Sequence, residues 1–180
     1  NDDDGPVRGD LDVWQGFAYD VVDFHERERE RMEARALLYA TAPKERYKPL
    51  RLFLSGKPGS GKSLVVRSFV RARRASARAR GVARAVARGA CVLAAPTGCA
   101  SFQMKFGAAI IHRTFGIPVG FCGPARNKHS EKYVKRLNRL KAARLFVLDE
   151  FSMVGRVMFG KVAFKTRECL GGVLTMGGKD

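Results

Sequence analysis

Apolar positions repeat with two different periods along the chain and predict helices that alternate with short strands. Residues 11–22 place apolar side chains three or four positions apart, as in an amphipathic helix, and the charged run behind them predicts that this helix continues to residue 40. Four apolar runs have the length of buried strands, and the last looks cut short. These runs are residues 50–55, 91–95, 145–148 and 172–176.

Further helices are predicted between and after these runs. Their expected ranges are residues 63–80, 100–105, 131–143 and 157–170. The third of them is basic and amphipathic, with Val134, Leu137 and Leu140 facing inward. Residues 83–89 are either a short helix or a loop, and residues 116–127, rich in glycine and proline, predict a surface loop. Strands alternating with helices predict an α/β fold with a mainly parallel sheet covered on both faces.

The run Gly56-Lys57-Pro58-Gly59-Ser60-Gly61-Lys62-Ser63 stands between a predicted strand and a predicted helix. Its spacing, GxxxxGKS, is that of a phosphate-binding loop. Small residues let the backbone turn tightly, so that successive N–H groups and the helix N-terminus face the phosphates. Lys62 would reach the outer phosphates and the Ser63 hydroxyl would ligate Mg²⁺. The alternative is a chance glycine loop, but both flanks favour a three-layer P-loop fold that binds a nucleoside triphosphate.

The predicted strand 145–148 ends on Asp149-Glu150. A parallel strand delivers such residues to the carboxyl edge of the sheet, where ligands bind. Asp149 can hold Mg²⁺ and Glu150 can orient or deprotonate an attacking water. An acid pair behind an apolar strand is by itself more often a surface feature, and the upstream phosphate loop makes the catalytic interpretation the favoured one.

Charge is unevenly distributed along the 180 residues. The chain holds 34 Lys and Arg against 17 Asp and Glu, a net charge of +17, and residues 46–130 contain no acid. This acid-free span includes an Arg/Ala-rich stretch whose positive field suits a polyanion such as nucleic acid. A solvated helix face explains the same stretch equally well, so charge alone does not decide the function.

Cysteines and flanking segments indicate the compartment. The four cysteines form no CxxC pair and have no histidine at zinc-ligand spacing, which predicts reduced and mostly buried thiols in an intracellular protein. The acidic residues 1–10 do not resemble a signal peptide and are expected to form a flexible lead-in. No apolar run has the length of a membrane span, and the absence of an initial methionine suggests a fragment or a processed product.

Four segments together resemble a known family. They follow in the order and at the intervals seen in superfamily 1B DNA helicases, and their sequences are GKPGSGKS, VLAAPTGCA, IIHRTFGI and FVLDEFSMV. The resemblance is strongest to the RecD-like and Pif-type branch of that superfamily, which includes the helicase domains of Helitron transposons. The resemblance runs from residue 11 to 180 and implies the first RecA-like domain of an ATP-dependent DNA helicase. ATP, Mg²⁺ and single-stranded DNA are its implied ligands. It also implies a nuclear or mitochondrial location in a eukaryote and processes such as DNA repair, recombination and telomere maintenance.

The resemblance assigns roles by position. Residues 11–22 resemble the family's opening motif, in which a glutamine reads the adenine; here this is Gln15, and a plain surface residue is the alternative. Pro96, Thr97 and Gly98 match a motif that touches the single-strand backbone. The residues that match the next DNA-contacting motif are His112, Thr114 and Phe115. An exposed ring there can stack a base, whereas a core phenylalanine and a packed histidine are the ordinary alternatives.

Several positions depart from the family pattern. Ile110 stands where the family has threonine, which removes one possible DNA contact, and Trp14 replaces an acid before the glutamine. The γ-phosphate motif is reduced to Asp180, and the second RecA-like lobe with its arginine finger is missing. This chain alone is therefore expected not to unwind DNA. The alternatives are a decayed transposon module that binds ATP or DNA without turnover, and a P-loop kinase or ATPase unrelated to DNA.

Overall fold

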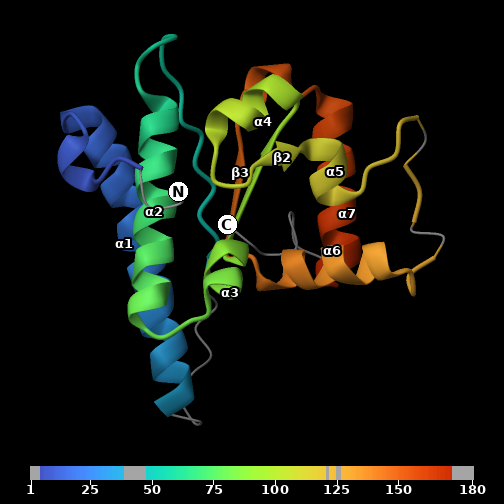
Figure 1. Ribbon diagram of the computed structural model, residues 1–180, viewed down its shortest axis with the longest axis horizontal. Helices are drawn as coiled ribbons and strands as arrows, with labels where there is room; N and C mark the ends of the chain where they lie inside the picture. Colours follow the sequence, from blue (N-terminus) through green and yellow to red (C-terminus); the bar gives the residue numbers. More distant parts are fainter. Residues whose placement is uncertain (1–4, 39–47, 121, 125–126, 172–180) are drawn as a thin grey trace. The chain divides into compact units, whose positions relative to one another are not determined.

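The computed structural model describes residues 5–38, 48–120, 122–124 and 127–171 (Figure 1). The chain divides into two compact units, residues 1–73 and 74–180, and each is described by itself. The single domain expected over residues 11–180 stays a prediction, and the strand expected at residues 172–176 lies outside the described residues. In chain order the elements are η1 (Arg8–Asp10), α1 (Val13–Leu38), α2 (Lys62–Ala79), α3 (Arg84–Gly89), β1 (Cys91–Ala95), α4 (Gly98–Met104), β2 (Ala109–Ile110), α5 (Ile111–Phe115), α6 (Glu131–Ala142), β3 (Leu145–Leu148), η2 (Phe151–Met153) and α7 (Arg156–Leu170).

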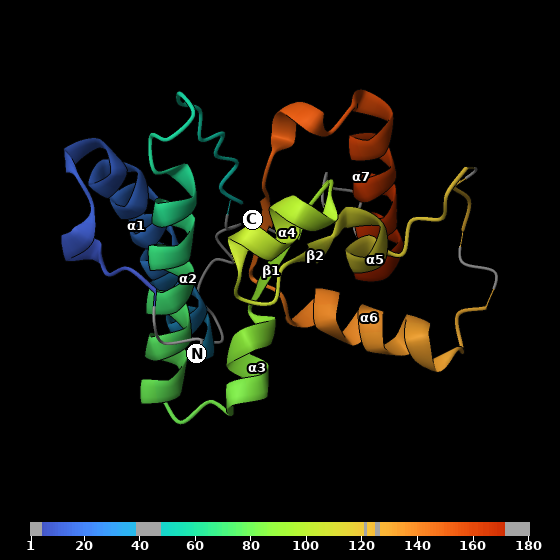
Figure 2. The same ribbon diagram turned by 45° about the horizontal axis from the view of Figure 1, so that its top comes forward.

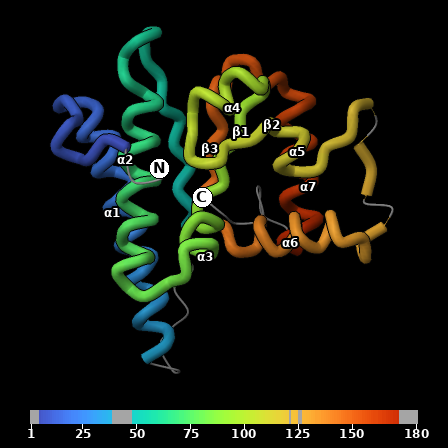
Figure 3. The backbone as a smooth tube through the Cα atoms, in the orientation of Figure 1, coloured from blue at the N-terminus to red at the C-terminus, as the bar shows by residue number. Residues whose placement is uncertain are grey.

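The first unit is built on α1 and the first part of α2, which lie side by side (Figures 1 and 3). Tyr19 on α1 meets Phe69 on α2 edge to face, with ring centroids 6.0 Å apart. Val65 and Val70 on α2 are buried in the same unit. Aromatic and branched side chains therefore hold the upper part of this helix pair together.

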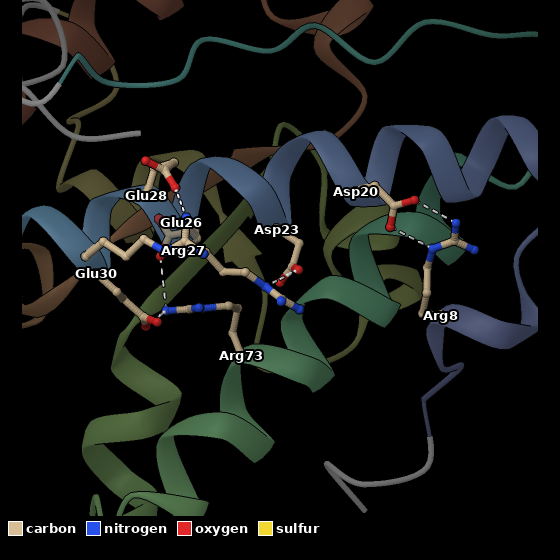
Figure 4. A network of polar contacts seen from close by, with 9 residues as sticks. Arg8, Asp20, Asp23, Glu26, Arg27, Glu28, Glu30 and Arg73 are labelled. Atoms are coloured by element: carbon tan, nitrogen blue, oxygen red, sulfur yellow. Dashed lines mark hydrogen bonds and ion pairs between the residues drawn. The ribbon is translucent and has the colours of Figure 1, made fainter.

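Further along the pair, ion pairs replace apolar packing. Arg73 on α2 lies 3.1 Å from the Glu26 carboxylate and 2.7 Å from the Glu30 carboxylate of α1 (Figure 4). Arg29 approaches Glu26 from the other side at 3.7 Å. The Glu26 side chain is only 3% exposed, so these cations offset the cost of burying its charge.

The buried face of α1 is not the one its apolar repeat predicts. Val13, Trp14 and Phe17 are 83%, 81% and 65% exposed, whereas Glu26 and Arg29 are buried. The reason is the basic composition of α2, which presents Arg73 to α1 and draws the acidic side of α1 toward it. The predicted helix is confirmed, but its assignment as an amphipathic helix with a buried apolar face is wrong.

The described part of the lead-in is attached to α1. Arg8 in η1 holds Asp20 through two hydrogen bonds, of 2.8 and 2.7 Å, visible in Figure 4. The Arg8 guanidinium lowers the pKa of the Asp20 carboxyl through this hydrogen bond. Residues 8–10 therefore form a turn held by an ion pair, and the flexible lead-in expected over residues 1–10 stays a prediction.

The strand predicted at residues 50–55 is wrong. These residues lie outside regular secondary structure, and Leu52 and Phe53 are 49% and 68% exposed. A strand needs a hydrogen-bonded neighbour, and in the part of the first unit that the structure describes the regular elements are all helical. The apolar run thus has the composition of a strand but not its backbone conformation.

The second unit contains a parallel sheet of order β2-β1-β3 among the described residues. Ala94 pairs with Ala109 of β2 and with Leu148 of β3, so β1 is the central strand (Figure 3). All five residues of β1 are buried, as expected for a strand covered on both faces. The parallel α/β class predicted from the sequence is confirmed, including the strands at 91–95 and 145–148.

One core packs against a face of this sheet. Val92 of β1, Phe115 of α5, Leu140 of α6 and Val162 of α7 belong to it, and α6 runs across the lower end of α7 (Figures 1 and 2). The helices expected at residues 63–80, 131–143 and 157–170 are confirmed within a residue of their bounds, and residues 84–89 form a helix. On α6, Leu140 is buried in the core and Leu137 packs against it, so their inward assignments are confirmed. Val134 is 40% exposed, so its inward assignment is wrong, and Tyr133 is buried instead.

Candidate functional site

The phosphate-binding loop has the backbone shape that its glycines predict. Gly59 and Gly61 have φ angles of +77° and +78°, a left-handed conformation that costs any other residue about 1–2 kcal/mol. A Cβ on Gly56 would lie 2.7 Å from Ser60 Oγ, so the turn also requires a small residue there. The N–H of Ser60 donates to Lys57 O at 3.2 Å and closes the turn. This open cradle of backbone at the start of α2 fits a phosphate group.

Lys62 is the first residue of α2 and folds back across the loop. Its Nζ donates to Gly56 O at 2.8 Å and to Lys57 O at 3.0 Å. Two carbonyls thus hold the ammonium beside the cradle, where it can exchange them for phosphate oxygens. Ser63, half-buried in the first turn of the helix, follows it. Both residues lie in the first turn behind the loop, as the sequence predicts, and their contacts with phosphate and Mg²⁺ stay predictions.

Gln15 reaches the same loop from α1. Its side-chain Nε2 donates to Ser60 O at 3.2 Å, and a Cβ placed on Gly61 would overlap this amide. The Gln15 side chain therefore bridges α1 and the phosphate loop, an arrangement open to an adenine-reading residue and to a plain surface residue alike. Its contact with adenine stays a prediction.

Asp12 holds Gln15 in position and was missed in the sequence. The Gln15 N–H donates to Asp12 Oδ1 at 2.8 Å, and the Asp12 N–H donates to Gln15 Oε1 at 3.2 Å. This reciprocal pair is the capping box of α1. The signal was present as D-x-x-Q at the start of a predicted helix. The capping box directs the Gln15 Nε2 toward Ser60, because the Gln15 Oε1 already accepts the hydrogen bond from the Asp12 N–H.

Asp149 and Glu150 belong to the second unit and follow β3. The Asp149 N–H donates to Ala94 O at 2.9 Å, which extends the β1–β3 ladder by one residue and fixes Asp149 at the carboxyl edge of the sheet. Glu150 is exposed and has φ 48° and ψ 46°. A non-glycine residue in this conformation is strained by about 1–3 kcal/mol, and such strain is typical of functional sites.

Pro96, Thr97 and Gly98 lie at the same sheet edge, directly after β1. The Thr97 hydroxyl accepts a hydrogen bond from the Ala100 N–H at 3.2 Å and caps α4. Gly98 is exposed, and Pro96 and Thr97 are half-buried. Because β1 and β3 are adjacent and parallel, this segment and Asp149 leave the sheet side by side. DNA contact by these three residues stays a prediction.

The predicted DNA-contacting motif on α5 is largely buried. Phe115 has no exposed surface and packs against Phe146, with ring centroids 6.0 Å apart. Thr114 is 2% exposed, and its hydroxyl donates to Ala109 O at 3.5 Å. A ring without exposed surface cannot stack a base, so the core alternative is the correct one for Phe115. Only His112, which is half-buried, is accessible among the three.

The cysteines and the possible metal ligands are the remaining groups that could carry other chemistry. All four cysteines are free; Cys91 and Cys169 are buried, as predicted, and Cys99 is exposed. Burial raises the pKa of the Cys169 thiol, which makes it a poor nucleophile. Among the described residues no group of three His, Cys, Asp or Glu side chains is arranged to hold a metal, and no helix there is long and apolar enough to cross a membrane.

The glycine-rich cradle at a helix start and the acid pair behind a parallel strand define an α/β nucleotide-binding protein of the P-loop class. The model of the PIF1-like helicase family matches residues 40–179 of the chain. This match covers well over half of the chain, and the chain belongs to that family. The resemblance to the Pif-type branch is thereby confirmed.

Solved Pif1 structures resemble the chain over part of their length. Unliganded Pif1 from Bacteroides is 28% identical with a TM-score of 0.51, and the match covers 69% of this chain and 24% of that one. Bacteroides Pif1 bound to single-stranded DNA is 29% identical with a TM-score of 0.48, covering 69% and 25%. A Pif1 structure on DNA unwinding at forked double-stranded DNA is 32% identical with a TM-score of 0.43, covering 50% and 21%. The chain thus spans no more than a quarter of these proteins, and no curated protein matches it.

Proposed function

We propose that this chain is the ATP-binding part of an ATP-dependent DNA helicase that couples ATP hydrolysis to movement along single-stranded DNA, in the 5′ to 3′ direction. The observation that carries the proposal is the phosphate loop, with Gly59 and Gly61 left-handed and Lys62 held beside the cradle. Family membership supports the same activity. A P-loop kinase unrelated to DNA is disfavoured because it gives the segment Pro96-Thr97-Gly98 no purpose.

The residues of each unit have separate proposed roles. Gly56, Pro58 and the following loop residues would surround the phosphates of ATP, and Lys62 would neutralise their charge. Ser63 and Asp149 are the proposed Mg²⁺ ligands, since hydroxyl and carboxylate oxygens are what this cation prefers. Bound Mg²⁺ supplies charge stabilisation to the transferred phosphoryl group. The exposed Glu150 carboxylate would accept a proton from the attacking water.

The nucleic-acid partner is proposed on the sheet edge. Gly98 is exposed and its neighbours Pro96 and Thr97 are half-buried, so backbone groups of this turn are accessible to a DNA phosphate. His112 is the accessible member of the next motif. A second RecA-like lobe would complete the motor, and an intracellular location with roles in DNA repair, recombination or telomere maintenance follows only from the family.

Mg-ATP hydrolysis with and without single-stranded DNA tests the proposal. We expect DNA to stimulate hydrolysis, and we expect both Lys62→Ala and Glu150→Gln to abolish it. Lys57→Ala in the same loop and Glu131→Gln on α6 are the matched controls, since both are exposed and lie outside the proposed roles. Hydrolysis that ignores DNA would support the kinase alternative. ATP binding without DNA-stimulated turnover, even after a second lobe is supplied, would support a decayed module.

A further inference from the structure

Nearly all of the net positive charge belongs to the second unit. Residues 74–180 hold 20 Lys and Arg against 5 Asp and Glu, a net charge of +15. Residues 1–73 hold 14 against 12 and are almost neutral. An excess of this size on one unit produces a strong local field and attracts polyanions. The first unit carries the phosphate loop, so ATP binding alone does not account for the distribution.

Part of this charge forms an ordered stripe on α6. Lys132, Lys135 and Arg139 are all exposed and follow one another at spacings of three and four residues, which places them on one side of the helix. Tyr133 and Leu140, each one residue further along the helix than Lys132 and Arg139, lie on a different side of α6 and are buried. Glu131 is the acid of this stretch, and it pairs with Lys135 one turn away.

The stripe continues onto α5. The guanidinium of Arg136 packs so closely against Gly116, the residue that ends α5, that a Cβ there would overlap it. Arg113 lies one turn before Gly116, and Arg139 lies one turn beyond Arg136, so the two arginines approach each other. Although the Arg139 side chain is exposed, partial desolvation of its guanidinium lowers its pKa, and the charge of Arg113 lowers it further. The fold therefore brings like charges together, which is unfavourable without an anion.

Helix stabilisation does not explain the stripe. Arg139 lies in the last turn of α6, where a cation favours the helix dipole, and so does Arg113 on α5. Lys132, however, lies in the first turn of α6, where a positive charge opposes the dipole. A role outside the helix itself accounts for both ends of the stripe.

We propose that Lys132, Lys135, Arg139 and Arg113, here called the basic stripe, bind the phosphate backbone of duplex DNA. Single-stranded DNA binds on exposed rings that stack its bases, whereas the rings beside this stripe, Tyr133 and Phe115, are buried. A row of cations along a rigid helix instead fits a regular row of phosphates. The C-terminus of α6 leads into the start of β3, at the sheet edge opposite to Asp149. The α6 part of the stripe is thus apart from Pro96, Thr97 and Gly98, the single-strand contacts proposed at the carboxyl edge of the sheet, and Arg113 adjoins His112 in the chain.

Equilibrium binding of the full chain to a fluorescent duplex of about 20 base pairs, without nucleotide, tests this assignment. The variant is Lys132→Gln with Arg139→Gln. The matched control is Arg156→Gln with Arg167→Gln on α7, which removes the same charge from exposed positions of the same unit. At about 50 mM salt we expect the stripe variant to bind about tenfold more weakly than the control, and its salt slope to fall by about 2. Circular dichroism confirms that both variants fold.

The outcomes separate this proposal from the ATPase. Equal binding of duplex by the stripe variant and the control would overturn it, whatever the hydrolysis assay shows. A loss seen with single-stranded DNA of the same length but not with duplex would also overturn it, as would a loss confined to anionic phosphatidylserine vesicles. A selective loss of duplex binding with unchanged nucleotide binding supports it, and Arg113→Gln alone should then give a smaller loss in the same direction.

Discussion

Substituting the two left-handed glycines of the phosphate loop isolates what the loop shape contributes to nucleotide binding. Gly59 and Gly61 have nearly equal φ angles, +77° and +78°. Their surroundings differ, because a Cβ on Gly59 meets nothing within 4 Å whereas one on Gly61 overlaps the Gln15 amide. Gly59→Ala therefore perturbs the backbone alone, and Gly61→Ala perturbs the backbone and the bridge to α1.

The expected magnitudes follow from these two terms. An alanine in the left-handed region costs about 1–2 kcal/mol, so each variant must restore the cradle at that cost and binds ATP about 5- to 30-fold more weakly. Gly61→Ala also displaces Gln15 from Ser60 O, a hydrogen bond of 3.2 Å. Losing one such bond costs about 1 kcal/mol, which is a further factor of about five.

Titration with a fluorescent ATP analogue measures the affinity of each variant for the nucleotide. Gly155→Ala is the control, because its Cβ also meets nothing within 4 Å and its φ of −61° suits any residue. When Gly61→Ala is introduced into the Gln15→Ala variant, it should no longer cause the further loss of ATP affinity by a factor of about five, because the overlapping amide is gone. The reasoning is refuted if Gly59→Ala binds like Gly155→Ala, or if Gly61→Ala is no weaker than Gly59→Ala.

Three further predictions concern the units themselves. Arg73→Met leaves the buried Glu26 carboxylate without its nearest cation and should lower the free energy of unfolding by about 3 kcal/mol in urea, while Glu26→Met with Arg73→Met recovers most of it. Phe115→Ala should cost about 3–5 kcal/mol, and Phe115→Leu should keep DNA affinity unchanged; a loss of affinity in a stable Phe115→Leu chain would restore the stacking role. Because Arg8 lowers the pKa of Asp20, their pair contributes stability above the ordinary carboxyl pKa of about 3.9 and loses it as the pH falls through the lower folded value. Thermal melts of Asp20→Asn should lack this acid dependence, and an identical acid limb in both proteins would contradict it.

Local signals predicted the elements that carry the nucleotide chemistry. The strands at 91–95 and 145–148 and the helix behind the phosphate loop appear where the pattern places them, because glycines and apolar runs act over a few residues. β2 has two residues, Ala109–Ile110, and α5 has five, so neither is long enough to show a period. Elements of this length are set by their neighbours in the sheet rather than by their own sequence.

Burial was harder to predict than secondary structure. The apolar repeat on α1 predicted the wrong buried face. The buried face is set by ion pairs with Arg73, which is 43 residues beyond Glu30 along the chain. Phe115 resembled a base-stacking ring by its place in a motif, but its ring fills the core beside Phe146. In both cases the side chain's partner lies far away in sequence, and no local pattern contains it.

The left-handed residues of the two units show how the chain treats backbone strain. In the phosphate loop the left-handed positions are Gly59 and Gly61, where the conformation is free of steric cost. At the end of β3 the same conformation falls on Glu150, where glycine would be cheaper by about 1 kcal/mol or more. The carboxylate there accepts no helix-capping hydrogen bond, so it does not recover that cost locally. The stability of the unit therefore does not explain the strain at Glu150, and an exposed carboxylate at this position is compatible with the catalytic role proposed for it.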